Sequence, residues 1–307
     1  MKVTTKEITE ALLARLWAKY LERVSYAREY QRLVIEKGGS VVNDHIAFRT
    51  LNTHTGEQPE GIKAIRHILT CLDYTPAEKY EFKKKKLKAV HFVHPDPMMP
   101  KIFVSQLEVD NFPEWAQQIM KSAVKDTPYL LSDRSIELLA TLKEKGELPR
   151  LAGESLVEDL AQYFRRPWKT PRKDDILKIN DVSQYAAWVL LHGNAVNHFT
   201  AFINYQNVPE WPDLETTCAG LSEAGIPMKE ALEGEKGGKL QQSATLAVKE
   251  EVEVKGEDGI EKMPWTYAYY ELAERGLVIE NGEEKLFSGF LGEQARHLFD
   301  MTRTREN

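Results

Sequence analysis

Two histidines and one glutamate, far apart in the chain, are the residues best suited to carry chemistry. His45 and His198 each stand in a short, largely apolar stretch typical of a strand, and Glu271 follows a row of aromatic residues. Two imidazoles and one carboxylate on one face of a divalent metal ion form the ligand set of non-haem iron oxygenases, which leaves the remaining coordination positions open. Convergence of these three side chains would therefore create a metal centre.

The spacing of the three residues predicts that separate strands supply them. They stand 153 and 73 residues apart, too far for a single local metal loop. Taken alone, each is a weak signal, because a single histidine on a strand is more often a hydrogen-bonded structural residue. A carboxylate in an aromatic row, however, is costly to bury unless it is paired or metal-bound. Glu274 would fall on the opposite face of the strand and is the weaker candidate.

Arg49 is the candidate for holding a substrate carboxylate. His45, Ala47 and Arg49 would share one face of a strand, and small Ala47 leaves room between the other two. The Cα atoms of His45 and Arg49 would lie ~13 Å apart. A keto acid chelated at the metal, with its far carboxylate in a bidentate pair with the guanidinium, fits that spacing. A surface pair between Arg49 and Asp44 or another carboxylate is the simpler alternative.

A polar row in the second half of the chain could also line the cavity. Gln241, Ser243 and Thr245 alternate with less polar residues and would face one side of a strand. We expect this side to face the cavity, with Gln241 and Ser243 as substrate-binding residues.

The composition excludes several classes of partner. The chain has 307 residues and a formal net charge of −6, which argues against nucleic acid or an anionic membrane as the main partner. No apolar stretch approaches the ~20 residues of a membrane span, and the N-terminus has no apolar segment of the signal-peptide kind. The only two cysteines lie in apolar contexts that favour buried thiols. We expect a cytoplasmic protein; an oligomer is compatible with the sequence.

The chain divides into two β-rich modules separated by a helical insert. Residues 1–110 would hold an N-terminal helix, which starts at the capping-box pattern Thr4–Glu7, and the first module. Residues 111–185 would form the insert and residues 186–307 the second module. The second module would end in a helical pattern over 292–300, which carries His297. All three parts would form one compact unit. Each module reads as a strand, a helix and further strands, which indicates duplication. The expected elements are strands over 41–50, 80–82, 87–93, 101–107 and 240–248 and around His198, and helices over 62–74 and 214–221.

Several segments resemble one known family, first catalogued as domain of unknown function 1338. The run 41–51, Val-Val-Asn-Asp-His-Ile-Ala-Phe-Arg-Thr-Leu, resembles the family's opening motif. The resemblance continues through 103–107, 185–188, 196–200 and 270–276. The family includes 2-oxoadipate dioxygenase/decarboxylases and is built on the vicinal oxygen chelate fold. The chain looks like its shorter form, without a long C-terminal extension.

The resemblance implies a fold and a set of site residues. The fold would be an α+β half-barrel of two βαβββ-type modules curled around a metal. His45 and His198 would be the histidine ligands, Glu271 the carboxylate ligand, and Arg49 the residue that holds the substrate carboxylate. The second module also looks like the iron-binding half of 4-hydroxyphenylpyruvate dioxygenase.

The function implied is an Fe(II)-dependent dioxygenase that decarboxylates a 2-oxo acid with O₂. The conversion of 2-oxoadipate to 2-hydroxyglutarate and CO₂ is the first expectation. The ligand set alone does not select iron, so a purified sample could carry Zn, Ni or Mn, and a non-oxidative lyase or hydrolase remains an alternative. A protein that binds a small acid without consuming it is a third.

Overall fold

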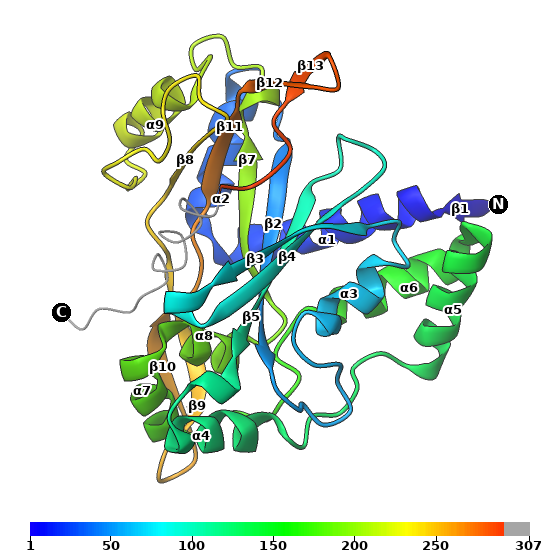
Figure 1. Cartoon of the computed structure of the whole chain (residues 1–307), viewed down its shortest axis with the longest axis vertical. Coiled ribbons are helices and arrows are strands. Elements are labelled where there is room, and N and C mark those ends of the chain that lie inside the picture. The colour runs from blue at the N-terminus through cyan, green and yellow to red at the C-terminus, as the bar shows by residue number, and fades with distance from the viewer. Residues whose placement is uncertain (292–307) are drawn as a thin grey trace.

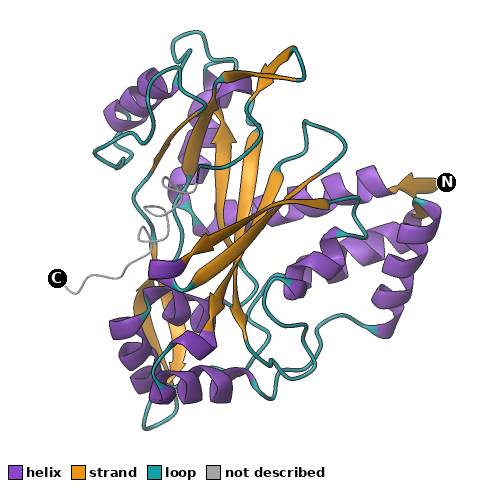
Figure 2. Ribbon diagram, in the orientation of Figure 1, coloured by secondary structure: helices purple, strands orange, loops and turns teal. Residues whose placement is uncertain are grey.

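Seven strands from both halves of the chain form one curled sheet, with strand order β3-β4-β5-β2-β7-β11-β8 (Figure 1). The computed structural model describes residues 1–291; the expected helix over 292–300 and His297 lie outside the described residues. Figure 2 shows the strands crossing the middle of the molecule with helices around them. The strands are β3 (Thr75–Phe82), β4 (Leu87–Val93), β5 (Lys101–Glu108), β2 (Asn43–Asn52), β7 (Val196–Phe202), β11 (Glu271–Arg275) and β8 (Leu240–Ala244).

The two modules repeat one pairing scheme around the centre of this sheet. In the first module the opening strand β2 pairs in parallel with β5, which pairs antiparallel with β4. In the second module β7 pairs in parallel with β11, which pairs antiparallel with β8. The modules join where β2 and β7 run antiparallel. The expected half-barrel of the vicinal oxygen chelate type is therefore confirmed.

The second module departs from the first in its third strand. The first module is a complete βαβββ unit, with α3 (Lys63–Leu69) between β2 and β3. The second has α9 (Leu214–Glu223) between β7 and β8, but its next strands β9 (Lys249–Lys255) and β10 (Ile260–Thr266) form a separate two-stranded sheet. The aromatic row before Glu271 is therefore not one continuous strand with it, because residues 267–270 between β10 and β11 belong to neither strand. A last hairpin follows, made of β12 (Leu277–Glu280) and β13 (Glu283–Leu286).

An N-terminal helix covers the back of β7. The capping box is present: the Thr4 side chain accepts from the backbone N–H of Glu7, and the Glu7 carboxylate accepts from that of Thr4. The helix breaks at Val24 into α1 (Thr5–Arg23) and α2 (Ser25–Glu36). Trp17 and Tyr20 of α1 each place their ring 5.0 Å from that of Phe199 on β7. Because neighbours on a strand face opposite sides, this packing turns His198 and Thr200 to the other face.

The segment between the modules is helical, as expected, with one short strand inside it. Its helices are α4 (Glu114–Val124), α5 (Asp133–Lys145), α6 (Arg150–Tyr163), α7 (Lys173–Val182) and α8 (Gln184–His192). The short strand β6 (Glu147–Pro149) pairs with an N-terminal strand β1 (Lys2–Thr4) that the sequence did not indicate. Tyr185 and Trp188 of α8 are buried, and the Tyr185 hydroxyl accepts from the backbone N–H of Thr50 on β2. Within residues 1–291, no helix has the length and apolar character needed to cross a membrane.

Candidate metal centre

His45, His198 and Glu271 meet in the middle of the sheet. One ligand atom from each lies within 4.8 Å of the other two, and all three residues are buried. The Nε2 atoms of His45 and His198 lie 3.5 and 3.3 Å from the two carboxylate oxygens of Glu271. Two donors that share a divalent metal at bonds of about 2.1 Å and at a right angle lie about 3 Å apart. The three side chains therefore have the spacing of a ligand set.

The register of three adjacent strands explains this convergence. Thr200 on the central strand β7 is paired with His45 on β2 and with Glu271 on β11, so these three residues form one row across the sheet. His198 lies two positions from Thr200 along β7 and thus on the same face. Thr200 also hydrogen-bonds His45 Nε2 at 3.0 Å. The pairing of the three strands thus brings together three residues that are far apart in the chain.

A polar side chain orients each imidazole. His45 Nδ1 lies 2.7 Å from Asp44 Oδ2, and His198 Nδ1 lies 3.0 Å from Asn197 Oδ1. A histidine that donates from Nδ1 to an oxygen presents an unprotonated Nε2, as metal-binding histidines commonly do. The residue before each histidine therefore selects the tautomer that points the lone pair towards Glu271. The sequence does show an oxygen-bearing side chain directly before each histidine, in Asn-Asp-His and Val-Asn-His. It does not show that this side chain bonds the imidazole that follows.

The carboxylate of Glu271 lacks a full set of hydrogen-bond partners. Gln242 donates to Oε1, whereas the buried Oε2 accepts no hydrogen bond from any of the described residues. Burial raises the pKa of Glu271 well above its usual range, and the charges of Glu233 and Asp44 raise it further. A buried carboxylate without partners is costly, and a cation at this position would remove that cost. The residues present therefore fit a bound metal ion.

The two imidazoles are suited to bind a metal without first losing a proton. Burial lowers the pKa of His198 well below its usual range, and the positive charges of nearby groups lower it further. Burial also lowers the pKa of His45, although the hydrogen bond to Asp44 opposes that shift. Both rings are consequently neutral at neutral pH, the form that coordinates metals.

These pKa shifts predict that metal affinity rises with pH. The folded protein raises the pKa of Glu271 above the usual glutamate value of 4.5. Below the raised pKa the carboxyl holds a proton that an incoming metal must displace, so binding should tighten by up to about ten-fold per pH unit. Competition with a metal buffer between pH 6 and pH 8 measures this slope. An affinity that does not change over this range would show that Glu271 is already ionised in the metal-free protein.

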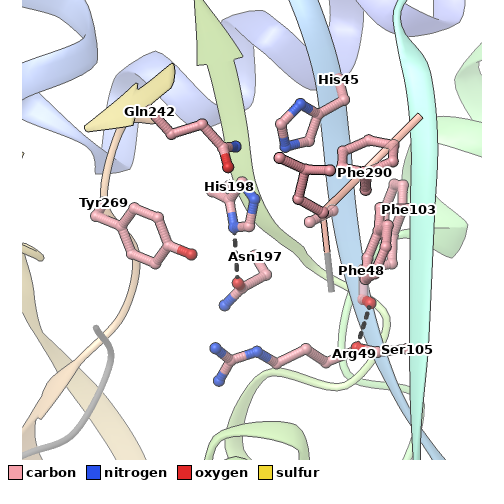
Figure 3. A pocket seen from close by; sticks show the side chains of 12 residues that line it. His45, Phe48, Arg49, Phe103, Ser105, Asn197, His198, Gln242, Tyr269 and Phe290 are labelled. Atoms are coloured by element: carbon pink, nitrogen blue, oxygen red, sulfur yellow. Dashed lines mark hydrogen bonds between the residues drawn. The ribbon is translucent and has the colours of Figure 1, made fainter. Parts of the chain in front are cut away.

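The cavity beside these residues, called the site pocket below, is lined mainly by side chains of β2, β5 and β7 (Figure 3). The imidazoles of His45 and His198 face it, and Arg49 approaches it from the opposite end. Glu271 is fully buried beside it. The residues that line it include His45, Arg49, His198, Gln242, Tyr269 and Phe290.

Arg49 lines the site pocket, as its position on the His45 face of β2 predicted. Its guanidinium carbon lies 5.0 Å from the Tyr185 ring and 5.2 Å from the Trp188 ring, both on α8. The alternative of a surface pair with Asp44 is wrong, because Arg49 is buried and Asp44 binds Arg275 and His45. The helical insert thus helps to hold this arginine at the pocket.

The assignment of Gln241 and Ser243 to the cavity needs correction. Gln242, not its neighbours, lines the site pocket and donates to Glu271. The register of β8 with β11 gives the reason: Gln242 pairs with Ala273, on the Glu271 face, whereas Gln241 and Ser243 pair with Glu274 and Leu272 on the other face. The prediction of a strand here is confirmed, but the face that lines the cavity is the one that carries Gln242.

A buried ion pair supports the His45 side of the site. Asp44 accepts two hydrogen bonds from the Arg275 guanidinium, one of them at 2.8 Å from Nη2, and both residues are fully buried. Burial alone would raise the pKa of Asp44, but the charge and hydrogen bonds of Arg275 lower it well below its usual range. The ionised carboxylate then remains available to His45 Nδ1.

Removing Arg275 should destabilise the protein strongly. Arg275→Met leaves the Asp44 carboxylate buried without its charge partner, which should lower the free energy of unfolding by about 3–5 kcal/mol. Arg15→Met is the matched control, because Arg15 forms an exposed pair with Glu158 and should contribute less than about 1 kcal/mol. Urea unfolding measures both variants; equal losses would contradict the buried-pair interpretation.

Comparison with known proteins identifies the family. The family model for 2-oxoadipate dioxygenase/decarboxylase matches residues 11–306. A chloroplastic 2-oxoadipate dioxygenase/decarboxylase of Arabidopsis thaliana is 26% identical over 89% of this chain and 70% of its own length. A chloroplastic/amyloplastic counterpart from Oryza sativa is 27% identical over 74% of this chain, which spans only 59% of that relative.

A solved structure agrees with the fold. The crystal structure of a protein assigned to the glyoxalase superfamily, from Ralstonia eutropha JMP134, superimposes with a TM-score of 0.86. The two proteins are 27% identical, and the match covers 94% of this chain and 87% of the other. Together with the family match over nearly its whole length, this shows that the chain belongs to the 2-oxoadipate dioxygenase/decarboxylase family.

Proposed function

We propose that this protein is an Fe(II)-dependent dioxygenase that oxidatively decarboxylates a 2-oxo acid, with 2-oxoadipate as the leading substrate. The reaction would consume one O₂ and convert 2-oxoadipate to 2-hydroxyglutarate and CO₂. The observation that carries the proposal is the buried cluster of His45, His198 and Glu271, in which Glu271 Oε2 accepts no hydrogen bond from the described residues. The activity named for the two plant relatives supports the substrate class.

The protein would contribute ligands, orientation and shielding. His45, His198 and Glu271 would hold the metal ion, which when bound would supply the redox chemistry that activates O₂. Arg49 would bind the far carboxylate of the acid and thereby fix its direction in the site pocket. Phe103 and Phe290 form an apolar wall beside His45, which would exclude bulk water from the reacting atoms.

Oxygen uptake tests the proposed reaction directly. Fe(II)-loaded protein is mixed with a panel of 2-oxo acids that includes 2-oxoadipate, and O₂ consumption and CO₂ release are recorded together. Uptake and release in a one-to-one ratio are expected. Turnover that continues without O₂ would instead support the non-oxidative lyase or hydrolase, and binding without turnover would support the acid-binding protein.

The proposed role of Arg49 predicts that its replacement weakens substrate binding without weakening metal binding. Arg49→Lys keeps the positive charge but loses the planar fork that binds a carboxylate through two hydrogen bonds. We expect kcat/KM for 2-oxoadipate to fall about ten-fold or more, mainly through KM, while metal affinity stays unchanged. Steady-state kinetics and metal titration measure the two quantities.

Arg172→Lys is the matched control for this substitution. Arg172 lines a surface cavity away from the metal centre. The kinetics of this variant should equal those of the unmodified protein. If Arg49→Lys also has unchanged kinetics, Arg49 does not bind the substrate carboxylate.

A further inference from the structure

The last described residues of the chain lie against the site pocket, far in sequence from the strands that form it. Phe290 and Leu291 both line the pocket. The Phe290 ring packs edge-on against His45, with 4.9 Å between ring centroids, and lies 5.1 Å from the Phe103 ring. Figure 3 shows Phe290 between these two residues. The C-terminal segment therefore contributes one wall of the cavity.

Arg275 fixes this segment in place. Its Nη1 donates to the carbonyl oxygens of Phe287 and Gly289, each at 2.8 Å, and its guanidinium carbon lies 5.4 Å from the Phe290 ring. The same guanidinium binds Asp44, which hydrogen-bonds His45. The position of the Phe290 wall is thus tied to the position of an inferred metal ligand by one buried side chain.

The space left between these side chains in the site pocket limits the size of the ligand that can enter. The cavity volume of the site pocket is about 30 Å³, room for a few water molecules at most. A six-carbon 2-oxo acid needs more space, so some lining side chains must shift when it binds. Ala47 and Phe103 belong to central strands of the sheet, whereas Phe290 lies on the half-buried segment beyond the last hairpin. Arg275 holds the backbone of this segment. The side chains of Phe290 and Leu291 are therefore the ones that can turn without disturbing a strand, and Phe290 is the one that contacts His45.

We propose that Phe290 determines the width of the acid that this site accepts, so that unbranched aliphatic 2-oxo acids enter and aryl-substituted ones are excluded. This inference rests on the proposed function, because it assumes that a 2-oxo acid binds at the site pocket. In an apolar pocket even a single methylene group changes discrimination about ten-fold or more. The whole phenyl ring of Phe290 can therefore account for a large difference in affinity between unbranched and aryl-substituted 2-oxo acids.

The test is a binding measurement that needs no turnover. Calorimetry on Fe(II)-loaded protein without O₂ gives Kd for 2-oxoadipate and for phenylpyruvate, and their ratio reports selectivity. Phe290→Ala should reduce the preference for 2-oxoadipate at least ten-fold by admitting phenylpyruvate, and Phe290→Leu should give an intermediate ratio. Phe287→Ala is the matched control, since Phe287 is on the same segment and its ring lies 5.7 Å from Lys239 Nζ.

Each outcome has a distinct meaning. A reduced ratio in Phe290→Ala with an unchanged ratio in Phe287→Ala supports the proposal. An unchanged ratio in Phe290→Ala, or equal changes in both alanine variants, overturns it. If the unmodified metal-loaded protein binds neither acid, the proposed function itself fails, and the role of Phe290 fails with it.

Discussion

Replacement of His198 by alanine is expected to abolish stoichiometric binding of a divalent metal and, with it, turnover of any 2-oxo acid. Loss of a side chain that merely orients a metal ligand already costs about 10–100-fold in affinity, so loss of a ligand should cost about 100-fold or more. His198 Nε2 lies 3.3 Å from Glu271 Oε2, and no other described histidine belongs to this cluster apart from His45. Metal content after dialysis and metal titration measure the effect.

His192→Ala provides a matched control for this substitution. His192 is as buried as His198, but it packs between Trp188 and Tyr267, outside the inferred ligand cluster. The control should lose stability yet bind one metal ion per chain. Retention of metal and turnover by His198→Ala would remove His198 from the ligand set.

Glu271→Gln is expected to have opposite effects on the metal-free and metal-loaded protein. Burial raises the pKa of Glu271 above the 4.5 that is usual for a glutamate. The stabilising contribution of the protonated carboxyl is therefore full below pH 4.5 and is lost as the pH rises through the folded pKa. At pH 8 the neutral amide should make the metal-free protein more stable by about 1–3 kcal/mol, the cost of a buried polar group without partners.

The same variant should gain nothing from metal. The unmodified protein is stabilised by a ligand that binds only the folded state, whereas the amide of the variant lacks the negative charge that would attract the cation. Unfolding curves at pH 8, with and without Fe(II), measure both effects. A metal-free variant less stable than the unmodified protein would show that Glu271 has partners that compensate its burial. A Glu274→Gln control should still be stabilised by metal, since Glu274 bonds the backbone N–H of Leu214 on the outer face.

The strands that carry the ligand candidates could be predicted because strand patterns are local, whereas the half-barrel fold and the roles of the ligands were implied by the resemblance to a known family. Strands repeat side-chain direction every two residues, so the His45 and His198 stretches show their buried character without tertiary information. The resemblance between the two modules indicated a duplicated strand–helix–strand unit. The positions of Arg49 and His45 on one face followed from the same periodicity.

Register and distant segments could not be predicted in the same way. The inward face of β8 depends on its pairing with β11, which no local pattern reports, and so Gln241 and Ser243 were chosen in place of Gln242. The short strands β1 and β6 pair with each other although they lie far apart in the chain, which no local pattern reports. Phe290 reaches the site pocket because Arg275 bonds the carbonyl groups beside it. Neither the composition nor the spacing of residues predicts this contact.

The location of the bound metal tests the central claim most directly. Crystals of Fe(II)-loaded protein grown without O₂, measured on both sides of the iron absorption edge, give an anomalous difference map that locates the ion. One peak in contact with Nε2 of His45, Nε2 of His198 and the carboxylate of Glu271 is the predicted result. A peak elsewhere, or protein that holds iron without density at these three side chains, would contradict the account.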